Sequence, residues 1–430
     1  MIENISVPMV ALSTGPKHHF FGYFDKSPWQ IEPDKSTLLL THETEIYDRM
    51  PFPGEKIAVG LIDTSVGREF IRLDETAVWN FQQGAMLQWL PWKEKTIIYN
   101  DKIGSELVAT IHNIHSGRKH HISRPVAAVS HDGNIALSIN FGRLLLVRPD
   151  YGYAGAIDPF MSDPCPNEDG IHKIDLKTGN SELLLPLAEI AALGNHGHPP
   201  DTFHWVNHLL FNPDDSRFCF LHRYKNSVGT IYTRLLTCNN DGTELHVLIS
   251  GMASHFDWRT NTELLAWAGE RKLLQSTVTG FSRKLPIGRF LKFLYRFLGK
   301  PRLLKSSLLN DRFILFQDMS EKQETIGKGL LNCDGHCSFS PDGNWFVTDT
   351  YPNNKGDLSL LLYHWLTGKL YKVQDFFSPL ILDNEIRCDL HPRWHHDGKR
   401  ICVDSAHDGT RQMYELDVSN LVTNKFSAEG

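Results

Sequence analysis

Histidine, cysteine and aspartate cluster in three short segments of this 430-residue chain. One begins at His255, one is Cys333-Asp334-Gly335-His336-Cys337, and one is Cys388-Asp389-Leu390-His391. Thiolates and imidazoles are ligands of tetrahedral zinc, whereas a divalent ion held by histidines alone is the competing geometry. A hydrogen-bonded polar cluster without metal is the structural alternative. The sequence therefore predicts a metal site, zinc or another divalent ion, with ligands among His255, Cys333, His336, Cys337, Cys388 and His391.

A second group of reactive side chains lies in the middle of the chain. His208 precedes one strand-like run, His222 ends the next, and residues 211–215 between them are typical of a hairpin turn. Histidine, arginine and tyrosine at one edge would supply a general base, a cation for a carboxylate and a general acid. A pair of structural histidines is the alternative. The catalytic candidates are His208, His222, Arg223, Tyr224 and Tyr232.

Polar and aromatic residues in several other loops are available to a ligand. At 79–84, amides beside aromatic residues suit a sugar, whose edges carry hydroxyl groups and whose faces are apolar. The residues 18–29 could instead form a closing strand, and Arg411 could simply pair with Asp404. The candidates for substrate binding are His18, His19, Tyr23, Lys26, Gln83, Arg148, Tyr151, His204, His407 and Arg411.

A repeated turn phrase predicts the elements that must position these residues. It is clearest at 339–343, Phe-Ser-Pro-Asp-Gly, which precedes the apolar run 345–347. Six looser copies lie between residues 28 and 398, and each enters a β-rich stretch. Seven small antiparallel sheets cannot each bury a face alone, and radial stacking solves that problem. The fold expected is all-β, a seven-bladed β-propeller formed by residues 1–430 as a single domain.

One segment, residues 281–305, interrupts this pattern. It carries basic residues and no acidic one, and Arg289, Lys292, Arg296 and Lys300 follow helical spacing between aromatic and aliphatic residues. We expect a helical, basic, amphipathic insertion. It either packs on the side of the propeller or contacts a membrane surface or partner through residues 287–300.

Three motifs resemble those of a known family. They are residues 18–29 (His-His-Phe-Phe-Gly-Tyr-Phe-Asp-Lys-Ser-Pro-Trp), residues 335–343 and residues 387–394. Together they resemble the propeller polysaccharide lyases, the group of oligogalacturonate lyases and ulvan lyases, over roughly residues 17–417. The resemblance is strongest towards the two ends and weakest over residues 281–320.

The resemblance implies cleavage of a uronic-acid-containing oligosaccharide or polysaccharide by β-elimination. In such a reaction a base removes the C5 proton, a cation or metal neutralises the carboxylate, and an acid protonates the departing O4. The resemblance implies that His208 and His222 act as base or acid. It implies that Tyr224 or Tyr232 acts as the acid and that Arg223 neutralises the substrate carboxylate. Zinc is structural in ulvan lyases, whereas a metal held largely by histidines neutralises the carboxylate in oligogalacturonate lyase.

Composition limits the other classes of function. The net charge of -6 argues against nucleic-acid binding. The sequence contains no glycine-rich phosphate-binding motif, so we expect no nucleotide cofactor. The first fifteen residues lack the pattern of a signal peptide, so we expect a cytoplasmic protein, with peripheral contact at the inner membrane through the insertion. A non-catalytic glycan-binding or membrane-proximal scaffold and an enzyme of surface-polysaccharide biosynthesis are the alternatives to a lyase.

Overall fold

The structure is a computed structural model that describes residues 2–30, 37–91, 95–194, 202–225, 231–270 and 310–423. The predicted insertion at 281–305 lies outside the described residues. Within those ranges, no helix has the length and apolar character that crossing a bilayer requires.

The repeated phrase forms the tight turns that the sequence predicts. The Ser340 hydroxyl donates to Asp342 Oδ1 at 2.5 Å, and Gly343 follows with φ +66°. The same turn recurs at 130–134, where Gly133 has φ +70°. This left-handed conformation favours glycine because it has no Cβ. Each turn joins a two-residue strand to a longer buried strand, and so starts a sheet.

The described strands form six separate sheets. Two of them come from the first third of the chain: β3 (His18–Phe20), β4 (Leu38–Thr44), β5 (Ile57–Asp63) and β6 (Phe70–Thr76); then β7 (Gln88–Trp89), β8 (Thr96–Ile103), β9 (Glu106–Asn113) and β10 (Arg118–Ile122). The third contains β11 (Ala128–Val129), β12 (Ile135–Ser138), β13 (Gly170–Asp175) and β14 (Ser181–Pro186).

The fourth sheet has seven strands, in the order β15 (Phe203–Phe211), β16 (Arg217–Lys225), β17 (Ile231–Asn239), β18 (His246–Trp258), β19 (Glu263–Glu270), β20 (Arg312–Gln317) and β21 (Gln323–Thr325). The fifth contains β22 (Ser338–Phe339), β23 (Trp345–Asp349), β24 (Asp357–His364) and β25 (Leu370–Phe377), to which β1 (Ile2–Asn4) adds in parallel. The sixth contains β26 (Arg393–Trp394), β27 (Arg400–Ser405), β28 (Gln412–Asp417) and β2 (Met9–Ala11). The short helices are α1 (Phe141–Val147), α2 (Leu187–Ala192), η1 (Asn384–Ile386) and α6 (Ser419–Val422).

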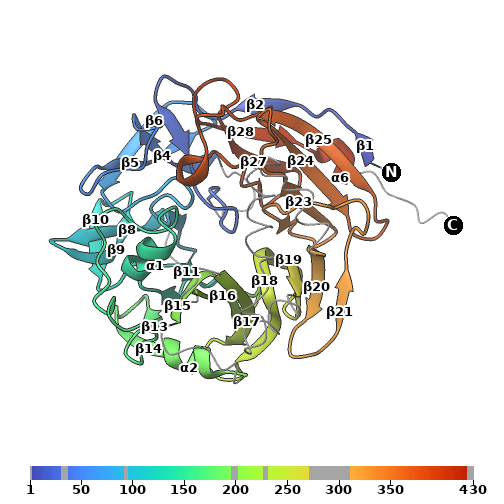
Figure 1. Cartoon of the computed structure of the whole chain (residues 1–430). Helices are drawn as coiled ribbons and strands as arrows, with labels where there is room; N and C mark the ends of the chain where they lie inside the picture. Colours follow the sequence, from blue (N-terminus) through green and yellow to red (C-terminus); the bar gives the residue numbers. More distant parts are fainter. Residues whose placement is uncertain are drawn as a thin grey trace.

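These sheets succeed one another in chain order around a common centre (Figure 1). The architecture is the nearly all-β, propeller-like one that the turn pattern predicts. The count of seven separate blades is not confirmed, because β15–β21 are one continuous sheet. Its long strand β18 pairs with β17 up to Gly251 and with β19 from Gly251 onward, so that one strand serves both sides.

The core lies between neighbouring sheets. Trp345 and Leu362 of the fifth sheet share one buried cluster with Ile401 and Leu416 of the sixth. Near the N-terminus, β2 pairs with β28, and the amide of His19 donates to the carbonyl of Arg411 at 2.8 Å. The two ends of the described chain are therefore held side by side, and the loop that follows β3 is fixed next to the last sheet.

Candidate metal centre and adjoining cavity

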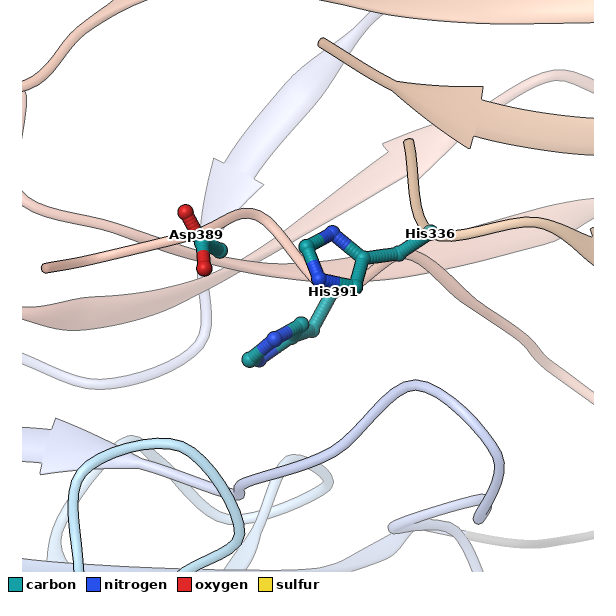
Figure 2. A group of neighbouring side chains, drawn as sticks. All are labelled: His336, Asp389 and His391. Carbon is teal, nitrogen blue, oxygen red and sulfur yellow. The ribbon is translucent and has the colours of Figure 1, made fainter. Parts of the chain in front are cut away.

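His336, Asp389 and His391 form a buried group whose candidate ligand atoms all lie within 4.8 Å of one another. Figure 2 shows the three side chains together, with the His336 ring extended towards Asp389. His336 comes from the loop before β22, and the other two come from the loop before β26. The loops that precede the first strands of the fifth and sixth sheets thus bring the three residues together. His391 has φ +43°, a left-handed conformation that a non-glycine residue adopts only at a cost.

The donor set of this group fits a divalent ion. Nε2 of His336 and Nε2 of His391 are buried atoms without a hydrogen-bond partner. A buried imidazole nitrogen normally has a partner, and two such atoms beside a carboxylate are an arrangement that a divalent ion would satisfy. Two imidazoles and one carboxylate are typical ligands for Mn²⁺, Fe²⁺ or Zn²⁺.

A cavity of about 230 Å³ adjoins the group. Tyr23 and His255 line it; the Tyr23 ring lies 5.2 Å from that of His391, and the His255 ring 4.1 Å from that of His336. The remaining lining residues are Arg148, Tyr151, Asn207, His208, Leu221, Arg223, Thr233, Met252, Ala253, Ser254, Tyr351 and Arg387. Aromatic rings, imidazoles and guanidinium groups therefore surround a space next to the candidate ligands.

His255 has the contacts of an oriented base. Its Nδ1 lies 2.9 Å from Asp334 Oδ1, and its Nε2 lies 3.5 Å from the Tyr351 hydroxyl. Burial lowers the pKa of His255, so the ring is neutral at pH 7. Because the carboxylate can only accept, Nδ1 carries the proton, and Nε2 keeps the lone pair that faces the Tyr351 hydroxyl. Burial also raises the pKa of Tyr351 well above its ordinary value, so its hydroxyl keeps its proton.

His208 is a second histidine of the cavity. It occupies a bulge in β15 with φ +53°, and its ring stacks on Phe256 at 4.2 Å. Its Nε2 has no hydrogen-bond partner, and burial lowers its pKa well below the ordinary value. His208 is therefore neutral and faces the cavity, although no carboxylate bonds to its ring among the described residues.

Arg223 supplies positive charge to the cavity. Its Nε is a buried atom without a partner, and it forms no ion pair with any described residue. Burial lowers its pKa to about 10, and Arg148 adds to that effect. Arg387, by contrast, pairs with Asp389 and lies 3.6 Å from Asp150. Unlike Arg387, Arg223 therefore has no ion-pair partner among the described residues, and an anionic ligand in the cavity would supply one.

Tyr23 lies between the cavity and the metal group, on the loop that follows β3. Arg393 holds that loop by donating to the carbonyl groups of Gly22 and Tyr23, and Asp404 accepts from the amides of Phe21 and Gly22. Gly22 has φ +129°, and a Cβ there would lie 2.8 Å from the carbonyl carbon and oxygen of Gln83. Only glycine fits this close approach.

Three of the predicted catalytic residues lie elsewhere. His222, Tyr224 and Tyr232 are absent from the cavity lining, whereas Arg223 belongs to it. His222 stacks on His204 and accepts from Arg234, and Tyr224 stacks on Tyr232. The reason is strand alternation: successive residues of β16 point to opposite faces of the sheet, so His222 and Arg223 cannot share a pocket.

The predicted cysteine ligands do not join the histidines. Cys337 packs among apolar side chains of the fourth and fifth sheets, and Cys388 packs with Leu382 and Ala406. Cys333 is also outside the metal group. Burial raises the pKa of the Cys333 thiol to about 12 and that of the Cys388 thiol to about 11. His255 contacts His336 but is not part of the group either.

Among the predicted substrate-binding residues, Tyr23, Arg148 and Tyr151 line the cavity. Most of the others have structural partners, and Gln83 lines a much smaller neighbouring cavity. His18 stacks on Tyr47, His19 contacts Glu43 and Gln412, Lys26 pairs with Asp25, His204 contacts His222, His407 contacts Ser405, and Arg411 donates to the carbonyl groups of Ile386 and Arg387. Arg411 therefore does not pair with Asp404, which bonds Arg393.

Sequence reasoning missed the acidic residues of the site. Asp389 stands two residues before His391, a spacing that puts both on one side of an extended segment. Asp334 is two residues before His336, and Asp349 and Tyr351 follow the buried run 345–348. Neither Arg387 nor these residues were expected in the site, although Arg387, Asp334 and Asp389 lie inside the motifs that the sequence offers.

Comparison with known proteins shows similarity in fold. No protein-family model matches the chain, and no curated protein matches it in sequence. An oligogalacturonate lyase solved in complex with manganese aligns with TM-score 0.60 and 14% identity, covering 97% of this chain and 98% of that one. The tricorn protease aligns with TM-score 0.51 and 9% identity, over 95% of this chain but only 34% of that one.

The oligogalacturonate lyase from Vibrio parahaemolyticus aligns with TM-score 0.60 and 13% identity, over 97% of this chain and 96% of that one. Along nearly its whole length, this protein is thus similar in fold to oligogalacturonate lyases.

Proposed function

We propose that the protein is a metal-dependent lyase that cleaves an acidic oligosaccharide or polysaccharide at a uronic acid by β-elimination. The observation that carries the proposal is the pair of unpartnered Nε2 atoms of His336 and His391 beside Asp389, next to a cavity with an unpaired guanidinium. The solved oligogalacturonate lyase complex with manganese supports a divalent ion of this kind. The His₂Asp donor set favours such an ion over a cysteine-ligated zinc.

His336, Asp389 and His391 would hold the ion, which when bound neutralises the substrate carboxylate and acidifies the neighbouring C–H bond. Arg223 supplies further positive charge to the cavity. A carboxylate placed there also relieves the cost of burying Arg223 alone.

His255 is the base in this proposal. Its Nε2 takes the C5 proton, while Asp334 holds the proton on Nδ1 and stabilises the imidazolium that forms. The electron pair of the C–H bond then forms the C4–C5 double bond, and the C4–O4 bond breaks. The Tyr351 hydroxyl, 3.5 Å from His255 Nε2, is the acid in this proposal and protonates the departing O4.

The test is direct. Purified protein loaded with Mn²⁺ is incubated with a panel of oligouronides and acidic polysaccharides, and the ultraviolet absorbance of the unsaturated uronate is followed. We expect product on at least one substrate and loss of product after chelation, restored by added Mn²⁺. Binding of uronides without product on the whole panel would overturn the lyase proposal and favour a glycan-binding protein.

A matched pair of variants tests whether the active site lies in the cavity. Tyr351→Phe removes a hydroxyl in the cavity, and Tyr232→Phe removes one outside it. We expect the first to lower turnover at least tenfold and the second to leave it within twofold of wild type. Equal loss in both would contradict the position assigned to the active site.

A further inference from the structure

We propose that Asp349 is a positioning residue that fixes the tautomer of His336 and the backbone of His391, so that both rings present Nε2 beside Asp389. The consequence for metal binding rests on the proposed function, but the positioning itself does not. Asp349 is the last residue of β23 and is not a member of the candidate ligand group.

The contacts of Asp349 converge from both histidines. Its Oδ1 accepts from the amide of His336 at 2.7 Å and lies 2.9 Å from His336 Nδ1. Its Oδ2 lies 2.9 Å from the same Nδ1 and accepts from the amide of His391 at 3.3 Å. An ionised carboxylate only accepts, so all these groups are donors and His336 carries its proton on Nδ1. In the neutral ring, Nε2 of His336 is then the nitrogen with a lone pair, and it is the one left without a partner.

The fold is arranged so that one carboxylate reaches both residues. Gly335 lets the loop before β22 approach β23 closely, because a Cβ at Gly335 would collide with the carbonyl oxygen of Asp349. The amide bond to His391 comes from the loop before β26 in the next sheet. That bond also helps to hold His391 at φ +43°, a conformation that a non-glycine residue keeps only when its surroundings support it. Asp349 thus links the two loops that supply the candidate ligands in Figure 2.

An amide at this position cannot replace the carboxylate. In Asp349→Asn, one oxygen becomes an NH₂ group that faces the His336 ring or the His391 amide, both of which are donors. The strain is relieved when His336 moves its proton to Nε2 and accepts from the new amide through Nδ1. The proton then occupies the position that a metal needs, although shape and volume are unchanged.

The experiment compares wild type, Asp349→Asn and Asp334→Asn, all in the full chain. Asp334 bonds His255 as Asp349 bonds His336, so its amide variant is a matched control. In metal-free protein labelled with ¹⁵N-histidine, NMR reports which nitrogen of each ring carries the proton. Titration calorimetry with Mn²⁺ gives the affinity, and thermal unfolding without metal checks the fold.

We expect wild-type His336 to be protonated at Nδ1, and Asp349→Asn to shift the proton to Nε2 and weaken Mn²⁺ binding about 10–100-fold. Asp334→Asn should leave the affinity within about threefold. An Nε2–H tautomer in wild type, or an Asp349→Asn variant that keeps both tautomer and affinity, overturns the inference. If wild type shows the Nδ1–H tautomer but binds no Mn²⁺, the positioning by Asp349 stands and the proposed metal centre fails. The wild-type spectrum decides the positioning even if Asp349→Asn does not fold.

Discussion

Arg393 Nη2 and Asp404 Oδ2 form a buried ion pair at 2.7 Å, and the same two side chains hold the backbone of residues 21–23. The pair therefore does two things: it satisfies two buried charges, and it fixes the loop that carries Tyr23 into the site. These two roles are separable by mutation.

Asp404→Asn leaves the Arg393 guanidinium buried and unpaired, so the free energy of unfolding should fall by about 3–5 kcal/mol. The double variant Arg393→Met/Asp404→Leu removes both charges and should recover most of that loss in chemical denaturation. Lyase activity should stay low in the double variant, because nothing then holds the Gly22 and Tyr23 carbonyl groups. Full recovery of activity together with stability would contradict a positioning role for the pair.

Removing either candidate imidazole ligand should abolish tight metal binding. We expect His336→Ala and His391→Ala each to weaken Mn²⁺ binding at least 100-fold, measured by calorimetry, and to lose turnover in proportion. Cys337→Ala is the matched control, because Cys337 neighbours His336 in sequence but packs in the apolar core. If Cys337→Ala weakened metal binding and His391→Ala did not, the metal would be bound by cysteine and not by this histidine.

The two histidines of the cavity should differ in their effect on turnover. His255 is oriented by Asp334 and His208 has no such partner, so His255→Ala should lower kcat by about 10²–10⁴-fold. His208→Ala should affect KM more than kcat. Kinetics with a single defined oligouronide give both constants, and the reverse pattern would assign the base to His208.

Arg223 should trade stability for function. Arg223→Met replaces an unpaired, partly buried guanidinium with an apolar side chain of similar length, and the free energy of unfolding should rise by about 1–2 kcal/mol. KM for a uronide should rise at the same time, because the substrate carboxylate loses a cation. Urea denaturation and steady-state kinetics measure the two effects. A less stable variant would show that Arg223 already has its counter-charge within the protein.

The pair His131–Asp215 should make stability depend on pH near neutrality. It joins the turn before β12 to the turn before β16, with His131 Nδ1 2.8 Å from Asp215 Oδ1. The hydrogen bond to Asp215 raises the pKa of His131 above that of an unfolded histidine, although burial opposes it. The stabilisation is therefore complete below about pH 6.5 and is lost as pH rises through the folded pKa.

The size of this effect is small, because the His131 side chain is 57% exposed. We expect wild type to lose less than about 1 kcal/mol relative to His131→Gln between pH 6 and pH 8.5 in urea denaturation. A pH profile identical in the two proteins would contradict the prediction.

The sequence predicts the fold better than it predicts the site. Turn phrases are local, so the Ser-Asp-Gly hydrogen bonds at 340–343 and 130–133 can be read from a few residues. Whether two sheets stay separate depends on how far one strand runs, and β18 continues through both of its pairings. No short sequence motif indicates that β18 continues through both pairings, so the number of separate sheets could not be predicted from the turn phrases.

For the site, the convergence of histidines was predictable and the side-chain directions were not. His255, His336 and His391 lie in succession, with ring centroids 4.1 Å and 4.3 Å apart, as a shared centre requires. The grouping of His222 with Arg223 ignored the period-two alternation of a strand, which the run 217–225 shows plainly. Asp349 could not be identified from sequence, because its contacts depend on the register between two sheets.

The loop bearing Tyr23 is held by Arg393 and Asp404, two residues of the last sheet that are synthesised long after the loop itself. Competence is therefore a late event in synthesis: while the ribosome is still making the final strands, the nascent polypeptide has nothing to grip that loop. Proteolytic removal of the last sheet would release that loop in the same way, without touching any of the residues that line the cavity.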